Sequence, residues 1–242
     1  MTHPLVETSP STRGRIAAAL SLLVIICGIT AQAVIADNIV VGTDAARTAA
    51  NIMGNKPLYR LAFTIFMIEM VANLAMTMVF YDLLKPVNRS VARLFAVVGW
   101  TGSGIKTLAR LFFYAPLFLL GGAPYLAVIP TAQLEALSLF FIKINSQAAA
   151  IAVIFFGFEA LLRGWLVFKS GFLPRVLGVV SMIGGLGWLT YLYPPLGSSM
   201  FIPVVLFAIA GAFGMAGWLL VRGVDDAKWR ERAALANASI WR

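Results

Sequence analysis

Six long apolar runs, separated by short polar segments, set the pattern of hydrophobic and polar positions along the 242-residue chain. A helix that crosses a bilayer needs about 20 predominantly apolar residues. The pattern therefore predicts an all-α polytopic membrane bundle of six helices, over about 15–36, 58–83, 91–120, 146–168, 175–194 and 200–222. We expect one transmembrane domain over 1–222 and a cytoplasmic surface tail over 223–242.

The first apolar run has two interpretations. It follows Arg13 and Arg15 and contains Ala31-Gln32-Ala33, which also fits a cleavable signal peptide. The polar lead and the uninterrupted continuation to Ala36 favour a retained helix.

Composition supports the membrane interpretation and excludes several classes of protein. The chain is 60% hydrophobic and only 12% charged, against about 25% charged residues in a soluble domain. An ordinary cytosolic enzyme, a disordered chain and a disulfide-built secreted domain are therefore excluded. Because Cys27 and His3 are the single cysteine and histidine, we expect no disulfide and no metal site within the chain. Whether the protein binds a cofactor is left open by the sequence.

Basic residues in the short loops predict the orientation, because cytoplasmic loops are enriched in Lys and Arg. With the N-terminus inside, the cytoplasmic side collects Arg13, Arg15, Lys85, Arg89, Arg93, Lys169, Arg175, Arg222, Lys228, Arg230 and Arg232. The opposite side keeps Arg47, Lys56, Arg60 and Lys143. Both termini are therefore predicted to be cytoplasmic. The net charge of +9 then reflects topology and anchoring to anionic lipid headgroups, not nucleic-acid binding.

Several segments outside the spans also carry helical signals. Residues 44–53 follow Thr43, a candidate N-cap, and precede Gly54, a candidate stop. Residues 131–145 have apolar positions at helical spacing. A helix joining them to the fourth span would be about 58 Å long, longer than a bilayer, so we expect a break or an interfacial position. We expect an uncharged turn at 194–199 and a short surface helix in the tail.

Two proline-containing turns are expected on the cytoplasmic side. Lys85-Pro86 and Leu173-Pro174 should end helices, because the residue before proline is disfavoured in the helical conformation. Asn88 and Ser170 are candidates to cap the helices that follow.

Several runs carry a resemblance to a known family: Arg15–Gly28, Gly42–Ile52, Tyr81–Arg89, Gly157–Leu162 and Phe168–Gly178. They resemble the bacterial family known as domain of unknown function 4386. The resemblance implies a six-helix bacterial inner-membrane protein and no assigned activity. Family members often carry His in the fourth span where this chain has Glu159, so a metal or haem role based on that His does not transfer.

Charged residues inside the apolar runs give the clearest candidate site. Glu69 lies fifteen residues before Leu84, and Lys106 lies fifteen residues after Val91. A short turn joins these two spans, so equal counts place both charges about 22 Å from it. We therefore expect Glu69 and Lys106 to form an ion pair. Arg110 lies one turn beyond Lys106, and Asn73 extends the polar stripe from Glu69.

The charge site has a functional and a structural interpretation. An unpaired charge at the bilayer centre costs about 2.5–3.5 kcal/mol, so these residues should face the bundle interior. They can form a substrate or proton site, or a buried pair that fixes helix register. The cation excess indicates an anionic ligand or a further acid. Glu159 is a candidate for that acid, although a local pair with Arg163 four residues on is simpler.

Two classes of function remain open. The first is a non-enzymatic membrane protein that binds a small anionic, amphiphilic or lipid ligand, or serves as an accessory subunit in a homo-oligomer or larger complex. The alternative is a small transporter or proton-coupled carrier that uses Glu69. An enzyme ranks below both, because the sequence shows no nucleophile and base together.

Overall fold

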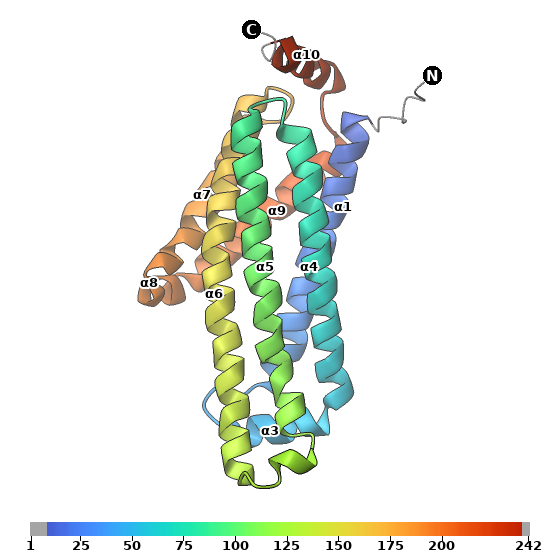
Figure 1. Cartoon of the computed structure of the whole chain (residues 1–242). Coiled ribbons are helices and arrows are strands. Elements are labelled where there is room, and N and C mark those ends of the chain that lie inside the picture. Colours follow the sequence, from blue (N-terminus) through green and yellow to red (C-terminus); the bar gives the residue numbers. More distant parts are fainter. Residues whose placement is uncertain (1–8, 239–242) are drawn as a thin grey trace, which may run out of the picture. The chain divides into compact units, whose positions relative to one another are not determined.

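The computed structural model describes residues 9–238, which form helices joined by turns with no strand. The all-α prediction is thus confirmed. The elements, shown in Figure 1, are α1 (Pro10–Ile29), the π-helical η1 (Thr30–Ala36), α2 (Asp37–Ile39), α3 (Ala45–Gly54), α4 (Lys56–Leu84), α5 (Arg89–Leu119), the 3-10 helix η2 (Pro124–Leu126), α6 (Thr131–Ser170), α7 (Arg175–Leu189), the 3-10 helix η3 (Thr190–Leu192), α8 (Pro194–Ser199), α9 (Phe201–Val221) and α10 (Asp226–Ala238).

The chain divides into two compact units. The first unit comprises Met1–Leu22, Asn73–Thr101 and Val153–Arg242, and the second comprises Leu23–Ala72 and Gly102–Ala152. Residues 1–8, which include His3, and residues 239–242 lie outside the described range.

Five helical stretches of the described chain are long and apolar enough to cross a membrane: Pro10–Ile39, Lys56–Leu84, Thr131–Ser170, Arg175–Leu192 and Phe201–Val221. The third predicted span corresponds to α5, which has 31 residues but carries Lys106 and Arg110 and is not among the five. Each predicted span therefore coincides with a long helix, and the count of six spans stays a prediction.

The expected break before the fourth span is wrong. Residues 131–170 form the single 40-residue helix α6, about 60 Å long at the helical rise. Residues 131–156 contain neither proline nor glycine, so nothing in the local sequence interrupts the helix. The bilayer length does not limit this helix, because a helix can continue beyond the thickness of a membrane, and the alternative of an interfacial position for residues 131–145 stays a prediction.

Three local predictions also need correction. The N-cap of α3 is Asp44, not Thr43, because the Asp44 side chain accepts a hydrogen bond from the Arg47 backbone N–H. Ser170 is not the cap of α7. Its hydroxyl instead accepts from the Leu173 N–H and donates to the Val167 carbonyl, which stabilises the turn. Residues 194–199 form the short helix α8 rather than a plain turn.

Other local signals hold. Asn88 caps α5 by accepting a hydrogen bond from the Val91 N–H at 3.0 Å. The described part of the tail forms α10, as expected for a short helix.

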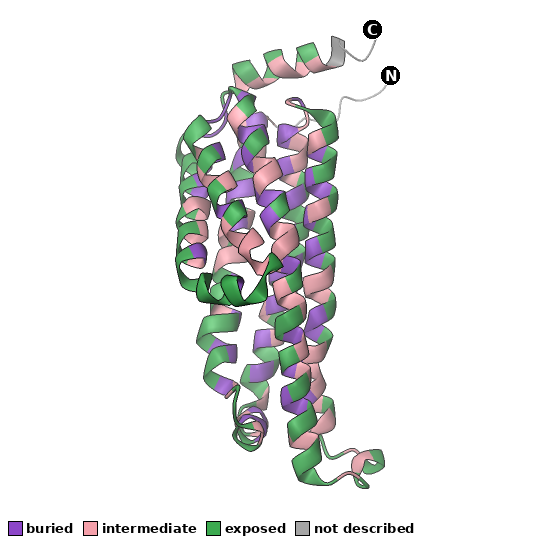
Figure 2. Cartoon of the chain, turned by 90° about the vertical axis from the view of Figure 1, so that its left-hand side faces the viewer, coloured by how far each residue is buried: buried purple, intermediate pink, exposed green. Residues whose placement is uncertain are grey.

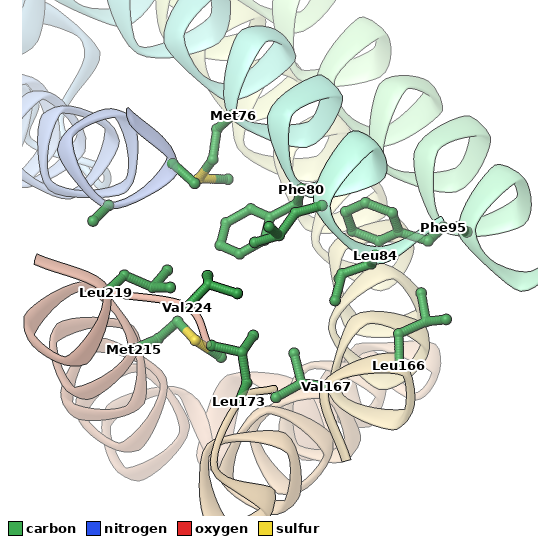
Figure 3. Close-up of a cluster of buried hydrophobic side chains, with 14 of the residues drawn as sticks. Met76, Phe80, Leu84, Phe95, Leu166, Val167, Leu173, Met215, Leu219 and Val224 are labelled. Carbon is green, nitrogen blue, oxygen red and sulfur yellow. The ribbon is translucent and has the colours of Figure 1, made fainter. Parts of the chain in front are cut away.

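Each unit has its own hydrophobic core. In the first unit, side chains from α1, α4, α5, α6 and α9 converge, including Met76, Phe80, Phe95, Leu166 and Leu219 (Figure 3). In the second unit, Ile35, Ile52, Phe66, Phe113 and Ile142 form a separate cluster. Buried positions follow stripes along the long helices, and many large apolar side chains are exposed between them (Figure 2).

Candidate functional site

In the second unit, α4 and α5 bring two charged side chains together. Lys106 Nζ donates to Glu69 Oε1 at 2.6 Å. Glu69 is only 4% exposed, and the Lys106 side chain is largely buried as well. Residue counting from the α4–α5 turn predicted this pairing, and the structure places the two residues in contact.

Arg110, one turn further along α5, is 2% exposed, and its hydrogen-bond and cation–π partners are neutral side chains. Its Nη1 donates to Asn145 Oδ1 of α6 at 3.2 Å. Its guanidinium carbon lies 3.5 Å from the centroid of the Phe66 ring, a close cation–π contact. Within the described residues, Arg110 Nε has no hydrogen-bond partner. We call Glu69, Lys106, Arg110 and Asn145 the Glu69 cluster.

Helix α1 supplies the surface opposite the carboxylate. A Cβ added to Gly28 would lie 3.4 Å from Glu69 Oε1, so the glycine allows α1 to approach the acid closely. The helix widens into the π-helical segment Thr30–Ala36 directly afterwards. Such segments are rare and frequently occur near functional sites.

Aromatic side chains form a rigid wall beside the Glu69 cluster. Tyr59 stacks on Phe113 with ring centroids 4.4 Å apart, and Phe66 meets Phe113 edge to face. The Tyr59 hydroxyl donates to the Phe113 carbonyl, three residues before Pro116 in α5. Because this wall is apolar, it strengthens electrostatic interactions beside it.

Sequence reasoning missed Asn145 and Phe66 as neighbours of Arg110. A buried asparagine in the apolar stretch of α6 was the signal available for the first. Asn73 is also buried and lies one turn beyond Glu69 in α4, but it belongs to the first unit, so the Glu69 cluster does not include it.

The first unit contains a second buried polar group. Glu159 is 4% exposed, and its Oε1 lies 3.6 Å from Arg163 Nη1 in the same helix. The predicted local pair is therefore present. Gly99 of α5 packs against it, since an added Cβ would lie 3.1 Å from Glu159 Cγ and 3.2 Å from Thr77 Cγ2. Among the described residues, Glu159 Oε1 and Thr77 Oγ1 have no hydrogen-bond partner.

The charge balance of the Glu69 cluster determines what it can do. The buried Glu69 and Arg110 lie with the partly buried Lys106, so two cationic side chains accompany one carboxylate, and the Asn145 amide is the further polar neighbour. A buried excess cation favours an anionic group nearby. Glu69 Oε2 has no hydrogen-bond partner within residues 9–238. In the same range, no three His, Cys, Asp or Glu residues are grouped so that they could hold a metal ion.

Comparisons with known proteins define the family but no activity. The family model described as "Domain of unknown function (DUF4386)" matches residues 16–223. An "Uncharacterized protein" of Archaeoglobus fulgidus is 26% identical over 172 residues, which cover 69% of this chain and 86% of that protein. No solved structure matches the chain.

Proposed function

The chain belongs to the family described as "Domain of unknown function (DUF4386)", and from its own residues we propose a non-enzymatic membrane protein that binds a small anionic or amphiphilic ligand. One observation carries this proposal: the Glu69 cluster buries two cations against a single carboxylate. Lys106 is neutralised by Glu69, whereas the hydrogen-bond and cation–π partners of Arg110 are the neutral Asn145 and Phe66. An anion beside Arg110 would complete the charge balance.

Binding of amphiphilic anions can be tested with three probes that have alkyl chains of equal length and differ in the charge of their headgroup. We would add laurate, dodecanol or dodecyltrimethylammonium to the purified protein in mild detergent and follow thermal unfolding. Laurate should raise the unfolding temperature, because a ligand that binds the folded state stabilises it, and the neutral and cationic probes should not. Equal shifts with all three probes would show that the alkyl chain, not the charge, is recognised.

Two variants locate the binding site. Arg110→Gln should abolish the laurate shift, whereas Arg60→Gln, which removes an exposed cation from α4 of the same unit, should leave it unchanged. If Arg110→Gln does not fold, Asn145→Ala provides the second test and should weaken laurate binding. Unchanged binding in a folded Arg110→Gln protein would contradict the proposed site.

The second candidate function is proton-coupled transport, and the Oε2 of buried Glu69, which has no hydrogen-bond partner among the described residues, favours it. A carboxylate that takes up a proton would release Lys106 and change the charge of the cluster. In proteoliposomes loaded with laurate, transport predicts that an imposed pH gradient drives flux and that Glu69→Gln abolishes it. Absence of flux with retained binding would support the binding function instead.

We also propose that α5 is a sixth span, so that both termini are cytoplasmic in a bacterial inner membrane. Adjacent residues of α5 support this: Arg110 is 2% exposed, whereas Leu111 is 64% exposed. A lipid environment favours this arrangement, in which the charged side chain is buried in the protein and the apolar side chain faces outward. At 31 residues, α5 is about 46 Å long, enough to cross the hydrocarbon core.

Single-cysteine labelling tests this topology. In a Cys27→Ser background, Ser90→Cys and Ala127→Cys place one thiol at each end of α5. A membrane-impermeant maleimide added to intact cells should label Ala127→Cys and not Ser90→Cys. The reverse pattern would invert the orientation, and the same result at both positions would contradict the proposed sixth span.

An accessory role remains part of the proposal, because the family description assigns no activity to this domain. Native mass spectrometry from mild detergent should then show a larger partner or a homo-oligomer. A monomer that retains only a small ligand would restrict the function to binding.

A further inference from the structure

A pocket of about 730 Å³ lies in the first unit, where α10 meets the turn between α4 and α5. Its wall combines three parts of the chain that are distant in sequence: the start of α1, residues 81–90 and residues 229–236. Figure 1 shows α10 beside that turn and the start of α1. The volume falls within the usual range of ligand pockets, about 300–1,000 Å³.

The lining of this pocket, which we call the α10 pocket, is strongly basic. Four cationic side chains line it: Arg13, Lys85, Arg89 and Arg232. No Asp or Glu is among its described lining residues. Lys85 forms an ion pair with Asp82, with 2.6 Å between Nζ and Oδ1. The pocket is therefore suited to a ligand that carries negative charge.

Specific contacts fix the position of α10 in the pocket wall and offset the repulsion between these cations. The Trp229 indole N–H donates to the Leu83 carbonyl at 2.8 Å, which fixes α10 to the end of α4. The Ser11 backbone N–H donates to Asp226 Oδ1 at 2.8 Å, which fixes α10 to the start of α1. Arg13 also lies over the Trp229 ring at 5.8 Å. These contacts fix α10 beside the other two parts of the wall, and Arg232 Nη2 also donates to the Lys169 carbonyl at 3.5 Å.

Two features of the α10 pocket indicate which anion it takes. Guanidinium groups bind phosphate oxygens in pairs of parallel hydrogen bonds, and three of the four cations are arginines. Tyr81, Trp229 and the 60% exposed Leu235 add amphipathic and apolar surface to the same wall. Aromatic and basic residues together are typical of the membrane–water interface and of lipid headgroup sites.

We propose that the α10 pocket binds a phosphate group, presented by the headgroup of an anionic phospholipid. The residues that carry this proposal are Arg89, at the start of α5, and Arg232 of α10, with Arg13 and Lys85 in the same lining. This site shares no residue with the Glu69 cluster and does not depend on its function.

The test uses the full-length protein in mild detergent and counts bound lipid by native mass spectrometry. Phosphatidate and phosphatidylglycerol should bind about tenfold more tightly than phosphatidylcholine, a ratio equivalent to one charge-assisted contact. Arg89→Gln/Arg232→Gln should remove this preference. The matched double variant Arg93→Gln/Arg230→Gln removes two exposed arginines from the same helices, outside the pocket lining, and should retain it.

Each other outcome overturns part of the proposal. Equal losses in both double variants would show binding to general surface charge instead of the pocket. Displacement of phosphatidate by millimolar inorganic phosphate would identify free phosphate as the ligand and overturn the lipid assignment. If the pocket double variant does not fold, Arg89→Gln alone, at an exposed position, should still reduce the preference, and an unchanged preference there would contradict the site.

Discussion

Lys106 of α5 and Glu69 of α4 form a buried ion pair with 2.6 Å between Nζ and Oε1. Removing one partner of such a pair leaves the other charge buried and uncompensated, which costs about 3 kcal/mol. We therefore expect Glu69→Gln to lower the free energy of unfolding by about that amount. Thermal or denaturant unfolding in detergent measures the change.

A double variant separates the pair from its individual residues. Glu69→Leu/Lys106→Met removes both charges and should recover most of the stability, because an apolar pair can replace a buried ion pair at little cost. If each single loss simply added to the other, the two residues would not be coupled and the pair would have no structural role.

Thr77 should tolerate loss of its hydroxyl better than a buried threonine usually does. It is fully buried, and its Oγ1 has no hydrogen-bond partner among the described residues. Thr77→Val replaces this unsatisfied group with a methyl group of similar shape, so stability should rise by about 1 kcal/mol.

Thr48, equally buried, provides the matched control. Its hydroxyl accepts from the Val41 N–H and donates to the Val41 carbonyl, both at 2.9 Å. Thr48→Val leaves both backbone groups without their partner and should destabilise the protein by about 2 kcal/mol. A destabilising Thr77→Val change would indicate that a water or ligand uses that hydroxyl.

Gly164 of α6 and Gly178 of α7 place two helix backbones in direct contact. A Cβ added to either would lie 2.6 Å from the carbonyl oxygen of the other. Gly164→Ala must push the helices apart, and we expect a loss of about 2 kcal/mol. Gly217→Ala in α9, where no neighbouring atom of the described residues lies within 4 Å of an added Cβ, should be neutral or slightly stabilising in the same unfolding assay.

The stability of the first turn of α10 should depend on pH through the carboxyl group of Asp225. Its carboxylate accepts the Lys228 backbone N–H at 3.2 Å and pairs with the Lys228 ammonium at 3.1 Å. The backbone hydrogen bond, followed by the side-chain contact, holds the pKa of this carboxyl below its ordinary value. A lowered pKa stabilises the folded form above the ordinary carboxyl range, and this contribution is lost as the pH falls through the lowered value.

The first turn of α10 should therefore open in acid and stay closed at neutral pH. Asp225→Asn should show faster hydrogen exchange at the Lys228 amide already at pH 7, as measured by NMR. Glu231→Gln, at an exposed position of the same helix, should leave that amide unchanged at pH 7. Identical exchange in wild type and Asp225→Asn would contradict the assigned role.

The sequence predicted those features that depend on one helix or on two helices joined by a short turn. The apolar runs located α4 and α5 to within about two residues at each end. Counting from a shared turn paired Glu69 with Lys106, because two antiparallel helices have equal rise per residue. The pair Glu159–Arg163 followed from spacing within one helix.

The sequence did not predict the features that depend on packing between helices that are distant along the chain. Asn145 meets Arg110 only because α6 packs beside α5, and the connection between these helices is too long for residue counting. The same holds for Gly28 and Glu69, which are 41 positions apart on α1 and α4. The α10 pocket combines both ends of the sequence, so no local pattern indicates it.

The glycine contacts between α6 and α7 have a consequence for motion. Gly157 faces Gly185 and Gly164 faces Gly178, with the same seven-residue interval on both helices. Sliding or rotating one helix against the other would bring a side chain onto a carbonyl oxygen at two levels at once. Any conformational change of this protein should therefore move residues 157–170 of α6 together with α7, because relative motion would have to break the contacts at both levels.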